Sequence, residues 1–463
     1  MKPTFQLKRR FEDDNIIHVP YSFLRQKSLI PNTLVELSFG SKAVECHIKI
    51  NEDCDKTVQL SENIYKQFNI PFESPIHLFY SNGCLSIGPL IGIFTAGFTS
   101  STQNPLGQRT SQYTKLLFSQ EEIGGFYFVF GHHHIDWENG VIDGYFLKDG
   151  NWKLVTVPFP NVIYNRIPNR RTENLETIQS AKMKFETEYA IPYFNPSFFN
   201  KWEIYSRLSK IKSVQTYLPV SLIEPQYDDI QSLLKQYKHL YLKPIEGSHG
   251  EEIKQLIKLP DEPYYYCRFH DENQIRLRRY SILKRLLKDE YPLGVNDIIV
   301  QQGIHLLKIG KHPTDFRIHT NKNIEGQWEV SAIAAKKAGW QSVTTHIHRG
   351  GEVISVEELC KNGLFSKEQV ESLNQAALTL SKVLEQQLEG CIGEIGFDLG
   401  IDENSHVWLF EANSKPGRLI FEQGKLKRED IISRELPLEY AIYLSRKAFE
   451  EPHQFMNKLV TQY

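Results

Sequence analysis

Two carboxylates and an amide near the end of the chain could hold a divalent cation. Side chains alternate across a β-strand, and in residues 394–401 the odd positions are all apolar, which leaves Asp398 on the opposite face. In residues 407–413, Glu411 and Asn413 are two apart and face one way. The polar residues between the two runs suit a turn. A hairpin would bring Asp398, Glu411 and Asn413 together as oxygen ligands that suit Mg²⁺, although a solvent-facing strand pair would look similar.

A lysine followed by glycines forms a second candidate binding element. Lys243 ends a short apolar run, and Gly247, Ser248 and Gly250 follow within a few residues. Glycine lets backbone N–H groups approach an anion, and serine adds a hydroxyl donor. Lysine supplies a point charge for phosphate oxygens. The segment predicts a phosphate site, or else an ordinary turn; it is not a P-loop, because the chain contains no GxxxxGK[ST] motif.

A third cluster alternates along a predicted strand. Asp315, Arg317 and His319 are two residues apart and therefore face one way. Arg317 could contact a phosphate or a substrate carboxylate, because its planar fork matches both. A structural ion pair would use the same residues.

Two further segments carry weaker signals. The run His132–His134 precedes Asp136 and could hold a metal if it formed a strand, but the spacing implies no further ligand, which favours a solvated loop or core histidines. The segment Arg276–Lys288 is basic and predicts a solvated amphipathic helix. Binding of nucleic acid or an anionic polymer is the alternative, for which Tyr280 is the one aromatic stacking group.

Composition excludes several classes of protein. The chain has 463 residues and a net charge of −2, so nothing global attracts it to nucleic acid or to an anionic membrane. Six scattered cysteines without a CxxC pair fit reduced thiols and a cytosolic protein. The N-terminus lacks the apolar core of a signal peptide. The longest near-apolar stretch, 85–98, is shorter than the roughly 20 residues that span a bilayer.

The pattern along the chain predicts an α+β protein of three domains. Residues 1–95 read as a small β-rich domain, residues 96–190 as an α/β domain, and residues 191–463 as a larger α+β domain that contains the candidate site. The clearest helix is predicted at 367–389, where Ser366 and Gln369 form a capping-box signal.

These residues together resemble the ATP-grasp superfamily over about 190–425. The matching segments occur in the family's order: Lys201-Trp202, Lys243-Pro244, the glycine loop, 298–304 and the Asp398…Glu411-Ala412-Asn413 ending. The ending is similar to that of D-alanine–D-alanine ligases. A narrower resemblance, to the YheC/YheD family of endospore coat-associated proteins, rests on residues 85–93, 164–168, 199–203 and 349–351. The length and the separate N-terminal domain are similar to the longer branch, YheD.

The resemblance implies an ATP-grasp fold with a β-rich N-terminal domain and an α/β pre-ATP-grasp domain. It places ATP between two lobes, with Lys201 and Lys243 on the phosphates and the glycine loop closing over them. Gln301 would face the adenine amino group, while the backbone of Gln302 and Ile304 would contact the ring edge. The same resemblance implies that Mg²⁺ is held by a set of three residues, Asp398, Glu411 and Asn413.

Three departures from the superfamily pattern limit what can be carried over. Gln301 stands where glutamate is frequent, and His346 where asparagine is usual. D-alanine–D-alanine ligases carry an arginine at the position of Gly396, so another group, Arg317 or Arg349, would have to stabilise the oxyanion. The substrates of those ligases therefore do not transfer to this chain.

The favoured hypothesis is an ATP- and Mg²⁺-dependent ligase that joins a carboxylate to an amine or thiol through an acyl phosphate. Its substrate would be a small-molecule or peptide carboxylate. By resemblance it would act in endospore coat formation, in the cytoplasm of the sporulating cell or in the coat, with coat proteins as partners. The alternative is a structural coat protein, with or without bound ATP, that catalyses no turnover. Nucleic-acid binding is the weakest hypothesis.

Overall fold

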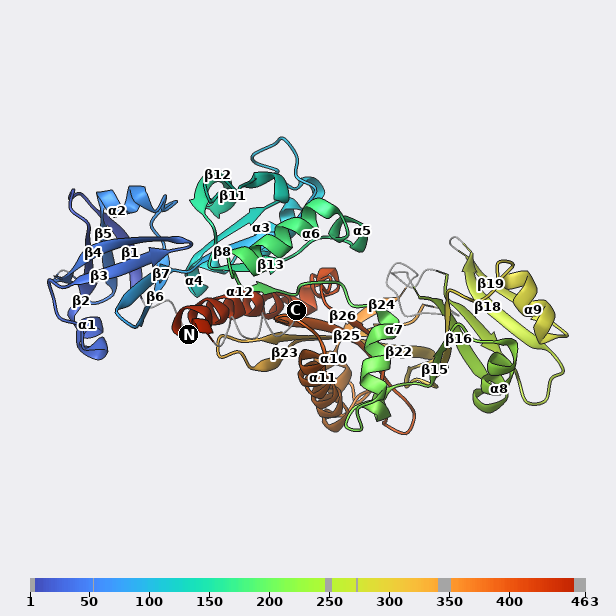
Figure 1. The fold of residues 1–463 in the computed structure, drawn as a ribbon. Coiled ribbons are helices and arrows are strands. Elements are labelled where there is room, and N and C mark those ends of the chain that lie inside the picture. The colour runs from blue at the N-terminus through green and yellow to red at the C-terminus, as the bar shows by residue number, and fades with distance from the viewer. Residues whose placement is uncertain (1–4, 53, 246–251, 272–273, 340–350, 454–463) are drawn as a thin grey trace.

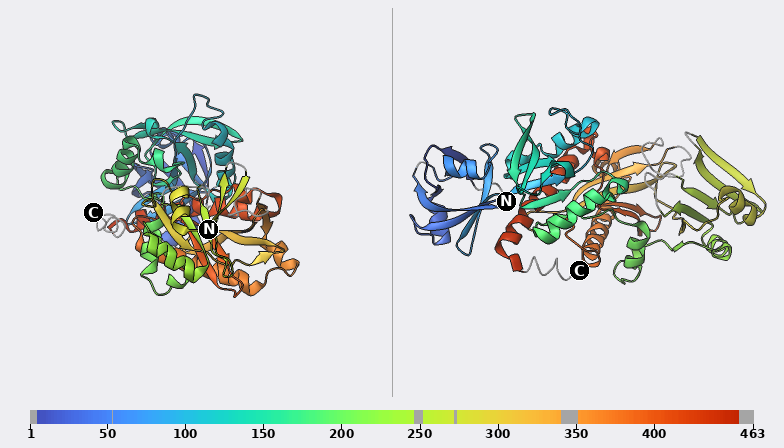
Figure 2. Two further views of the ribbon diagram at one scale, coloured as in Figure 1. Left: turned by 90° about the vertical axis from the view of Figure 1, so that its right-hand side faces the viewer. Right: turned by 45° about the horizontal axis from the view of Figure 1, so that its top comes forward.

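The computed structural model describes residues 5–52, 54–245, 252–271, 274–339 and 351–453. Four sheets follow one another along an elongated molecule (Figures 1 and 2). A barrel lies at one end, a six-stranded sheet lies at the other, and the two central sheets share the C-terminal helix (Figure 1). None of the helices within the described ranges combines the length and apolarity needed to span a membrane.

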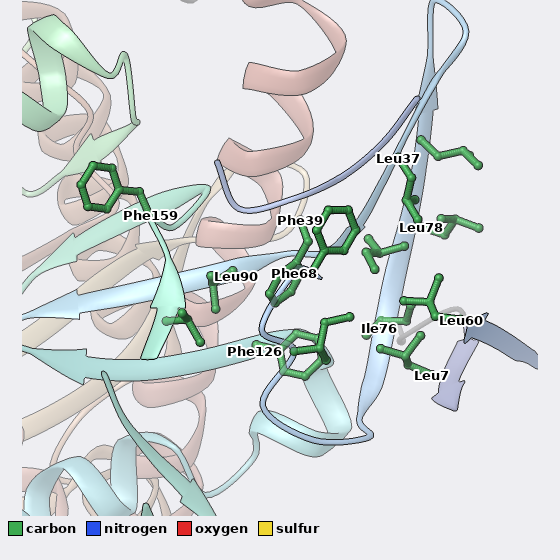
Figure 3. Packing of buried hydrophobic residues seen from close by; sticks show 14 of the residues in the cluster. Leu7, Leu37, Phe39, Leu60, Phe68, Ile76, Leu78, Leu90, Phe126 and Phe159 are labelled. Atoms are coloured by element: carbon green, nitrogen blue, oxygen red, sulfur yellow. The ribbon is translucent and has the colours of Figure 1, made fainter. Parts of the chain in front are cut away.

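The N-terminal sheet closes into a barrel in the order β1-β5-β2-β4-β3-β7-β6. Its elements are β1 (Phe5–Arg10), β2 (Ile16–Pro20), α1 (Tyr21–Lys27), β3 (Leu34–Phe39), β4 (Lys42–Asn51), β5 (Thr57–Ser61), α2 (Glu62–Gln67), β6 (Pro75–Ser81) and β7 (Cys84–Gly88). Leu7, Leu37 and Leu60 fill its interior, and Phe39 packs edge-on against Phe126 of the next sheet (Figure 3). One apolar core therefore joins the barrel to its neighbour.

The second sheet contains parallel and antiparallel strands in the order β10-β11-β9-β8-β13-β14, with β12 beside β11. Its strands are β8 (Leu90–Phe94), β9 (Phe126–Phe130), β10 (Ile135–Asp136), β11 (Val141–Lys148), β12 (Asn151–Pro158), β13 (Val162–Asn165) and β14 (Tyr193–Phe194). The helices of this region are α3 (Thr110–Leu116), α4 (Gln120–Ile123), α5 (Arg170–Glu173) and α6 (Glu176–Met183). The run His132–His134 forms a 3₁₀ turn, so the strand considered for it was wrong.

The third sheet is antiparallel, in the order β15-β20-β16-β17-β18-β19. It comprises β15 (Ser221–Ile223), β16 (His239–Pro244), β17 (Lys254–Ile257), β18 (Tyr265–Asp271), β19 (Gln274–Tyr280) and β20 (Ile298–Gln302), with α8 (Tyr227–Tyr237) and α9 (Leu283–Glu290) packed on one face. The single helix predicted across Arg276–Lys288 is wrong. Residues up to Tyr280 pair with β18, and the buried leucines with helical spacing begin only at Leu283.

The fourth sheet has the order β24-β23-β22-β25-β26, with β21 beside β22. It comprises β21 (Lys308–Ile309), β22 (His312–Lys322), β23 (Trp328–Lys337), β24 (Glu352–Ser355), β25 (Glu394–Ile401) and β26 (Val407–Asn413). The helices around it are α7 (Lys201–Ser209), α10 (Val356–Lys361), α11 (Lys367–Gln387) and α12 (Lys427–Glu450). The predicted capping box starts α11, where the Gln369 backbone N–H donates to the Ser366 hydroxyl.

The two faces of the fourth sheet have opposite character. The apolar side chains of β25, including Ile395 and Phe397, pack with Leu373 and Leu380 of α11. The alternate residues therefore point away from α11. Of these residues, Asp398 lines a cavity between the fourth and third sheets, whereas Glu394 meets Tyr164 of the second sheet.

Candidate functional site

The predicted hairpin is confirmed, with β25 and β26 antiparallel. Asp398 pairs with Glu411, and Gly396 pairs with Asn413. Asp398 and Glu411 line a cavity of about 530 Å³ between the third and fourth sheets. Asn413 lies one step further along β26, and the described lining of this cavity does not include it. The structure therefore brings the two carboxylates to one cavity and leaves Asn413, opposite Gly396, outside the described lining.

The cavity draws residues from both sheets and from the segment after β20. The third sheet contributes Tyr241, Lys243, Gln255, Arg268, Gln301 and Gln302, the fourth contributes Asp315, Lys336, Asp398 and Glu411, and the segment after β20 contributes Ile304. Charged residues of the fourth sheet and mixed residues of the third sheet thus enclose a volume of small-molecule size, with Gln301, Gln302 and Ile304 at one edge.

Asp398 lies in a buried ion-pair network. Lys336 Nζ is 2.6 Å from Asp398 Oδ1 and 3.1 Å from Asp315 Oδ1, and an Arg317 guanidinium nitrogen is 3.1 Å from Asp398 Oδ2. Burial alone would lower the pKa of Lys336, but Asp315 and Asp398 outweigh it and the pKa is raised. Two cations therefore balance two acids at the floor of the cavity.

Lys336 was missed by the sequence reasoning, which named Asp315 only as a neighbour of Arg317 on one strand face. Ala332, Ala334 and Lys336 alternate along β23, which places Lys336 on the same face as Asp315, its register partner on β22. A lysine that follows two alanines on the same strand face could have indicated a cavity residue, because small side chains leave that face of the sheet uncovered. Arg317 was predicted, and the structure places it against Asp398.

Lys243 and Gln301 face each other across β16 and β20. Lys243 Nζ donates to Gln301 Oε1 at 2.6 Å, and Gln301 Nε2 donates to the Ser221 hydroxyl at 3.1 Å. Because lysine has only donors, its partner atom must be the amide oxygen, which fixes the orientation of Gln301. Burial lowers the pKa of Lys243 to about 8; Glu411 opposes this shift and Lys201 adds to it.

Lys201 reaches the same place from α7. Asn200 caps this helix by accepting from the Trp202 and Glu203 backbone N–H groups at 3.0 Å. Lys201 Nζ lies 3.8 Å from Glu411 Oε1, and Lys201 lines a small hollow next to the cavity that also contacts Lys243. The structure thus gathers both predicted lysines around Glu411.

The remaining predicted residues fall into two groups. Gln302 and Ile304 line the cavity, and Gln302 also exchanges hydrogen bonds with the Val220 backbone through its N–H (2.8 Å) and its side-chain oxygen (3.1 Å). Gly247, Ser248, Gly250, His346 and Arg349 lie outside the described residues. The predicted glycine loop and one of the two candidate oxyanion groups therefore have no structural account here.

Close packing against Pro416 explains why glycine occupies position 396. A Cβ at this position would lie 2.5 Å from Pro416 Cβ, so a larger residue would displace the segment after β26. His319, its partner on β22, is fully buried, and neither ring nitrogen has a hydrogen-bond partner among the described residues. Burial, then Arg317 and Arg418, hold the pKa of His319 well below its usual value.

The donor set fits a magnesium ion better than a transition metal. Within the described residues, no group of three or more histidine, cysteine, aspartate or glutamate side chains is arranged to hold a metal, and the run His132–His134 is no exception. Mg²⁺ is usually bound by one or two carboxylates, with water and substrate phosphates completing its shell. Asp398 and Glu411 could supply these carboxylates, and Asn413 could supply a further oxygen only from outside the described lining of the cavity.

Comparison with known proteins defines the class of this chain as ATP-grasp. The profile of the family described as "YheC/D like ATP-grasp" matches residues 190–444, and the chain belongs to this family. It is 40% identical over 429 residues to the endospore coat-associated protein YheD of Bacillus subtilis (strain 168), covering 92% of this chain and 94% of YheD. YheC of the same organism is 21% identical over 289 residues, which cover 59% of this chain and 75% of YheC.

Among solved structures, a D-alanine–D-alanine ligase from Bacillus anthracis in complex with ATP has a TM-score of 0.41 and 12% identity, covering 81% of this chain and 99% of the ligase. Another structure of a ligase of the same name and organism has a TM-score of 0.44 and 13% identity, covering 78% and 98%.

Proposed function

We propose that the chain binds Mg-ATP in the cavity between its third and fourth sheets and acts as a carboxylate–amine or carboxylate–thiol ligase. The observation that carries the proposal is that Lys243, Asp398 and Glu411 line one cavity, and that Lys201 approaches Glu411 from the hollow next to it. Asp398, Glu411 and Asn413 would hold Mg²⁺, which neutralises phosphate charge when bound. Such phosphoryl transfer depends mainly on positioning and on cations placed where negative charge develops.

The residues at the hinge fit the adenine end of the nucleotide. The Gln301 oxygen has a second lone pair beyond the bond from Lys243, and it can accept from the adenine amino group. The backbone of Gln302 and Ile304 would contact the ring edge. Arg317, held by Asp398, is the described group best placed to stabilise the oxyanion of an acyl-phosphate step.

The biological setting follows from the relatives. YheD and YheC are both named endospore coat-associated proteins. We place the chain in endospore coat formation, in the cytoplasm of the sporulating cell or in the coat, with ATP and Mg²⁺ as cofactors. Its substrate would be a small-molecule or peptide carboxylate, and coat proteins would be its partners.

A structural coat protein without turnover is the second candidate. Both carboxylate oxygens of Asp398 already have cationic partners, and Pro416 leaves no room for a larger side chain at Gly396. The two candidates separate in a screen of nucleotide consumption against amino acids, peptides and cell-wall fragments, with Glu411→Ala as control. ADP release that requires both a carboxylate and an amine or thiol supports the ligase, and its absence across the screen supports the structural role.

Removal of magnesium is expected to weaken ATP binding at least about tenfold. Without the cation, nothing bridges the triphosphate to the carboxylates of Asp398 and Glu411, and like charges repel. Calorimetric titrations of ATP in excess Mg²⁺ and in EDTA measure the difference. AMP, which lacks the β- and γ-phosphates, serves as the control ligand and should bind equally in both buffers. If ATP binds with the same affinity in EDTA as in excess Mg²⁺, the proposed metal site is wrong.

Mg-ATP affinity is also expected to fall as the pH rises from 7 to 9. The pKa of Lys243 is about 8, so its charge is present below that pH and lost above it. The charged groups that act on it are Glu411, Lys201, Asp398 and Asp315. Titration at several pH values tests the profile, and Lys243→Arg should flatten it because arginine stays charged. A profile unchanged in Lys243→Arg would assign the dependence to another group.

A further inference from the structure

The cavity has a second end, marked by two histidines. His239 and Lys243 stand at the two ends of β16, about 13 Å apart at the usual rise per residue of a strand. The His239 ring lies 4.8 Å from the His305 ring, and it packs where a Cβ on Gly303 would stand. Burial, His305 and Arg268 lower the pKa of His239 to about 4, so it is neutral at pH 7. We call this region the histidine end.

Arg268 projects into the histidine end with no acidic partner among the described residues. It lies on β18 beside Gln255, and its Nε donates to Gln255 Oε1 at 2.9 Å. Gln255 in turn donates to the Tyr241 hydroxyl at 3.3 Å. Burial lowers the pKa of Arg268, and the Tyr241 phenol opposes that shift. Partial burial of a guanidinium costs free energy when its hydrogen-bond partner is a neutral amide, and a bound anion would offset that cost by balancing the charge.

The other charges of this end are also positive. Lys258 and Lys308 line the cavity here. Lys258 donates to the backbone carbonyl of Glu262, and Lys308 Nζ lies 3.8 Å from Glu403 in a pair in which both side chains are more than half exposed. The acids of the described lining, Asp315, Asp398 and Glu411, all belong to the fourth sheet. The cavity is therefore acidic and metal-binding on one side and cationic at the histidine end.

We infer that the histidine end binds an oxyanion, a phosphate or carboxylate group separate from the triphosphate, with Arg268 as its main partner. The inference rests on the proposed function, because a nucleotide with its phosphates at Lys243 directs its ribose and base toward His239. In Rossmann dinucleotide sites a carboxylate holds the ribose hydroxyl of NAD, whereas an arginine accommodates the ribose phosphate of NADP, and we apply the same chemistry here. The anion is carried either by the nucleotide ligand on its ribose or by a second, acidic substrate.

The first arm of the test compares AMP with adenosine 2′,5′-bisphosphate and adenosine 3′,5′-bisphosphate by calorimetry. If the nucleotide carries the anion, the parent binds one bisphosphate at least about tenfold more tightly than AMP. Arg268→Gln should abolish this preference, and Arg268→Lys should keep part of it. Arg276→Gln is the matched control, because Arg276 is an exposed arginine of the same sheet that does not line the cavity.

The second arm titrates inorganic phosphate and glutarate into protein saturated with Mg-ATP. Two results together would assign the anion to a second substrate. Arg268→Gln weakens the binding of phosphate or glutarate at least about tenfold, and in the first arm AMP and the bisphosphates bind with equal affinity. If Mg-ATP binds and neither arm depends on Arg268, the inference is overturned and the proposed function stands. If the parent does not bind Mg-ATP, both fail. Thermal unfolding midpoints close to the parent's establish that the variants are folded.

Discussion

The Lys243→Ala protein is expected to bind Mg-ATP roughly 30- to 150-fold more weakly than the parent, a loss of about 2–3 kcal/mol. Lys243 lies half-buried in the cleft, where a charge-assisted bond to phosphate is stronger than at the surface. Glu411→Ala should produce a loss of similar size by removing a metal carboxylate. Calorimetric titration of Mg-ATP into the three proteins measures both effects.

The control for this experiment is Lys235→Ala, which removes an exposed lysine on α8 and should leave the affinity unchanged. Because Lys243→Ala also leaves Gln301 Oε1 without its donor, the thermal unfolding midpoint of each variant is measured alongside. Lys243→Met keeps most of the apolar stem and separates the loss of charge from the loss of packing. Equal affinities in the parent, Lys243→Ala and Glu411→Ala would end the nucleotide proposal.

The acidic hairpin could be predicted because its determinants are local. The apolar odd positions of β25 are buried against α11, and a strand with one buried face permits only one register. Glu411 and Asn413 are fixed to one side by their spacing of two. The exact pairing could not be predicted. The register at the turn, where Leu399 pairs with Leu409, would place Phe410 opposite Asp398, and a shift of register between Asp398 and Leu399 brings Glu411 there instead.

The partners of Asp398 could not be predicted in the same way. Lys336 reaches Asp398 across β22, through two strand pairings whose registers are set by contacts far apart in sequence. In the basic segment 276–288, a local pattern gave the wrong secondary structure. Its charges suggested one helix, but pairing of β19 with β18 overrides helix propensity up to Tyr280. Long-range pairing decided both cases.

Glu394 shows how one pattern can lead to two outcomes. It shares the polar face of β25 with Asp398, yet it lies at the junction with the second sheet rather than in the cavity. There it accepts from the Tyr164 hydroxyl and an Arg166 guanidinium nitrogen, each at 2.6 Å, and it also pairs with Arg418. Alternation predicts the face of a carboxylate, but the residues that meet it come from β13, from the residue directly after β13 and from the segment after β26.

Replacement of Glu394 by alanine is expected to be the most destabilising single change at this junction, at about 3–5 kcal/mol. Arg418 is buried and Arg166 is largely so, and both would lose the acid that balances them. Burial would raise the pKa of Glu394, but Arg418 and Arg166 outweigh it and hold the pKa below its usual value. The stabilisation by Glu394 is therefore present above the ordinary carboxyl pKa and is lost as the pH falls below it.

Thermal unfolding measures this effect, and the midpoint of Glu394→Ala at pH 7 should fall by at least about 5 °C. Glu394→Gln keeps the shape and the hydrogen bond from Tyr164 while removing the charge, so its midpoint should lie between those of Glu394→Ala and the parent. Glu357→Ala breaks a surface ion pair with Lys361 and should have almost no effect. As the pH falls toward 4, the gap between the parent and Glu394→Gln should narrow. A constant gap would mean that shape, rather than charge balance, holds the second and fourth sheets together at Glu394.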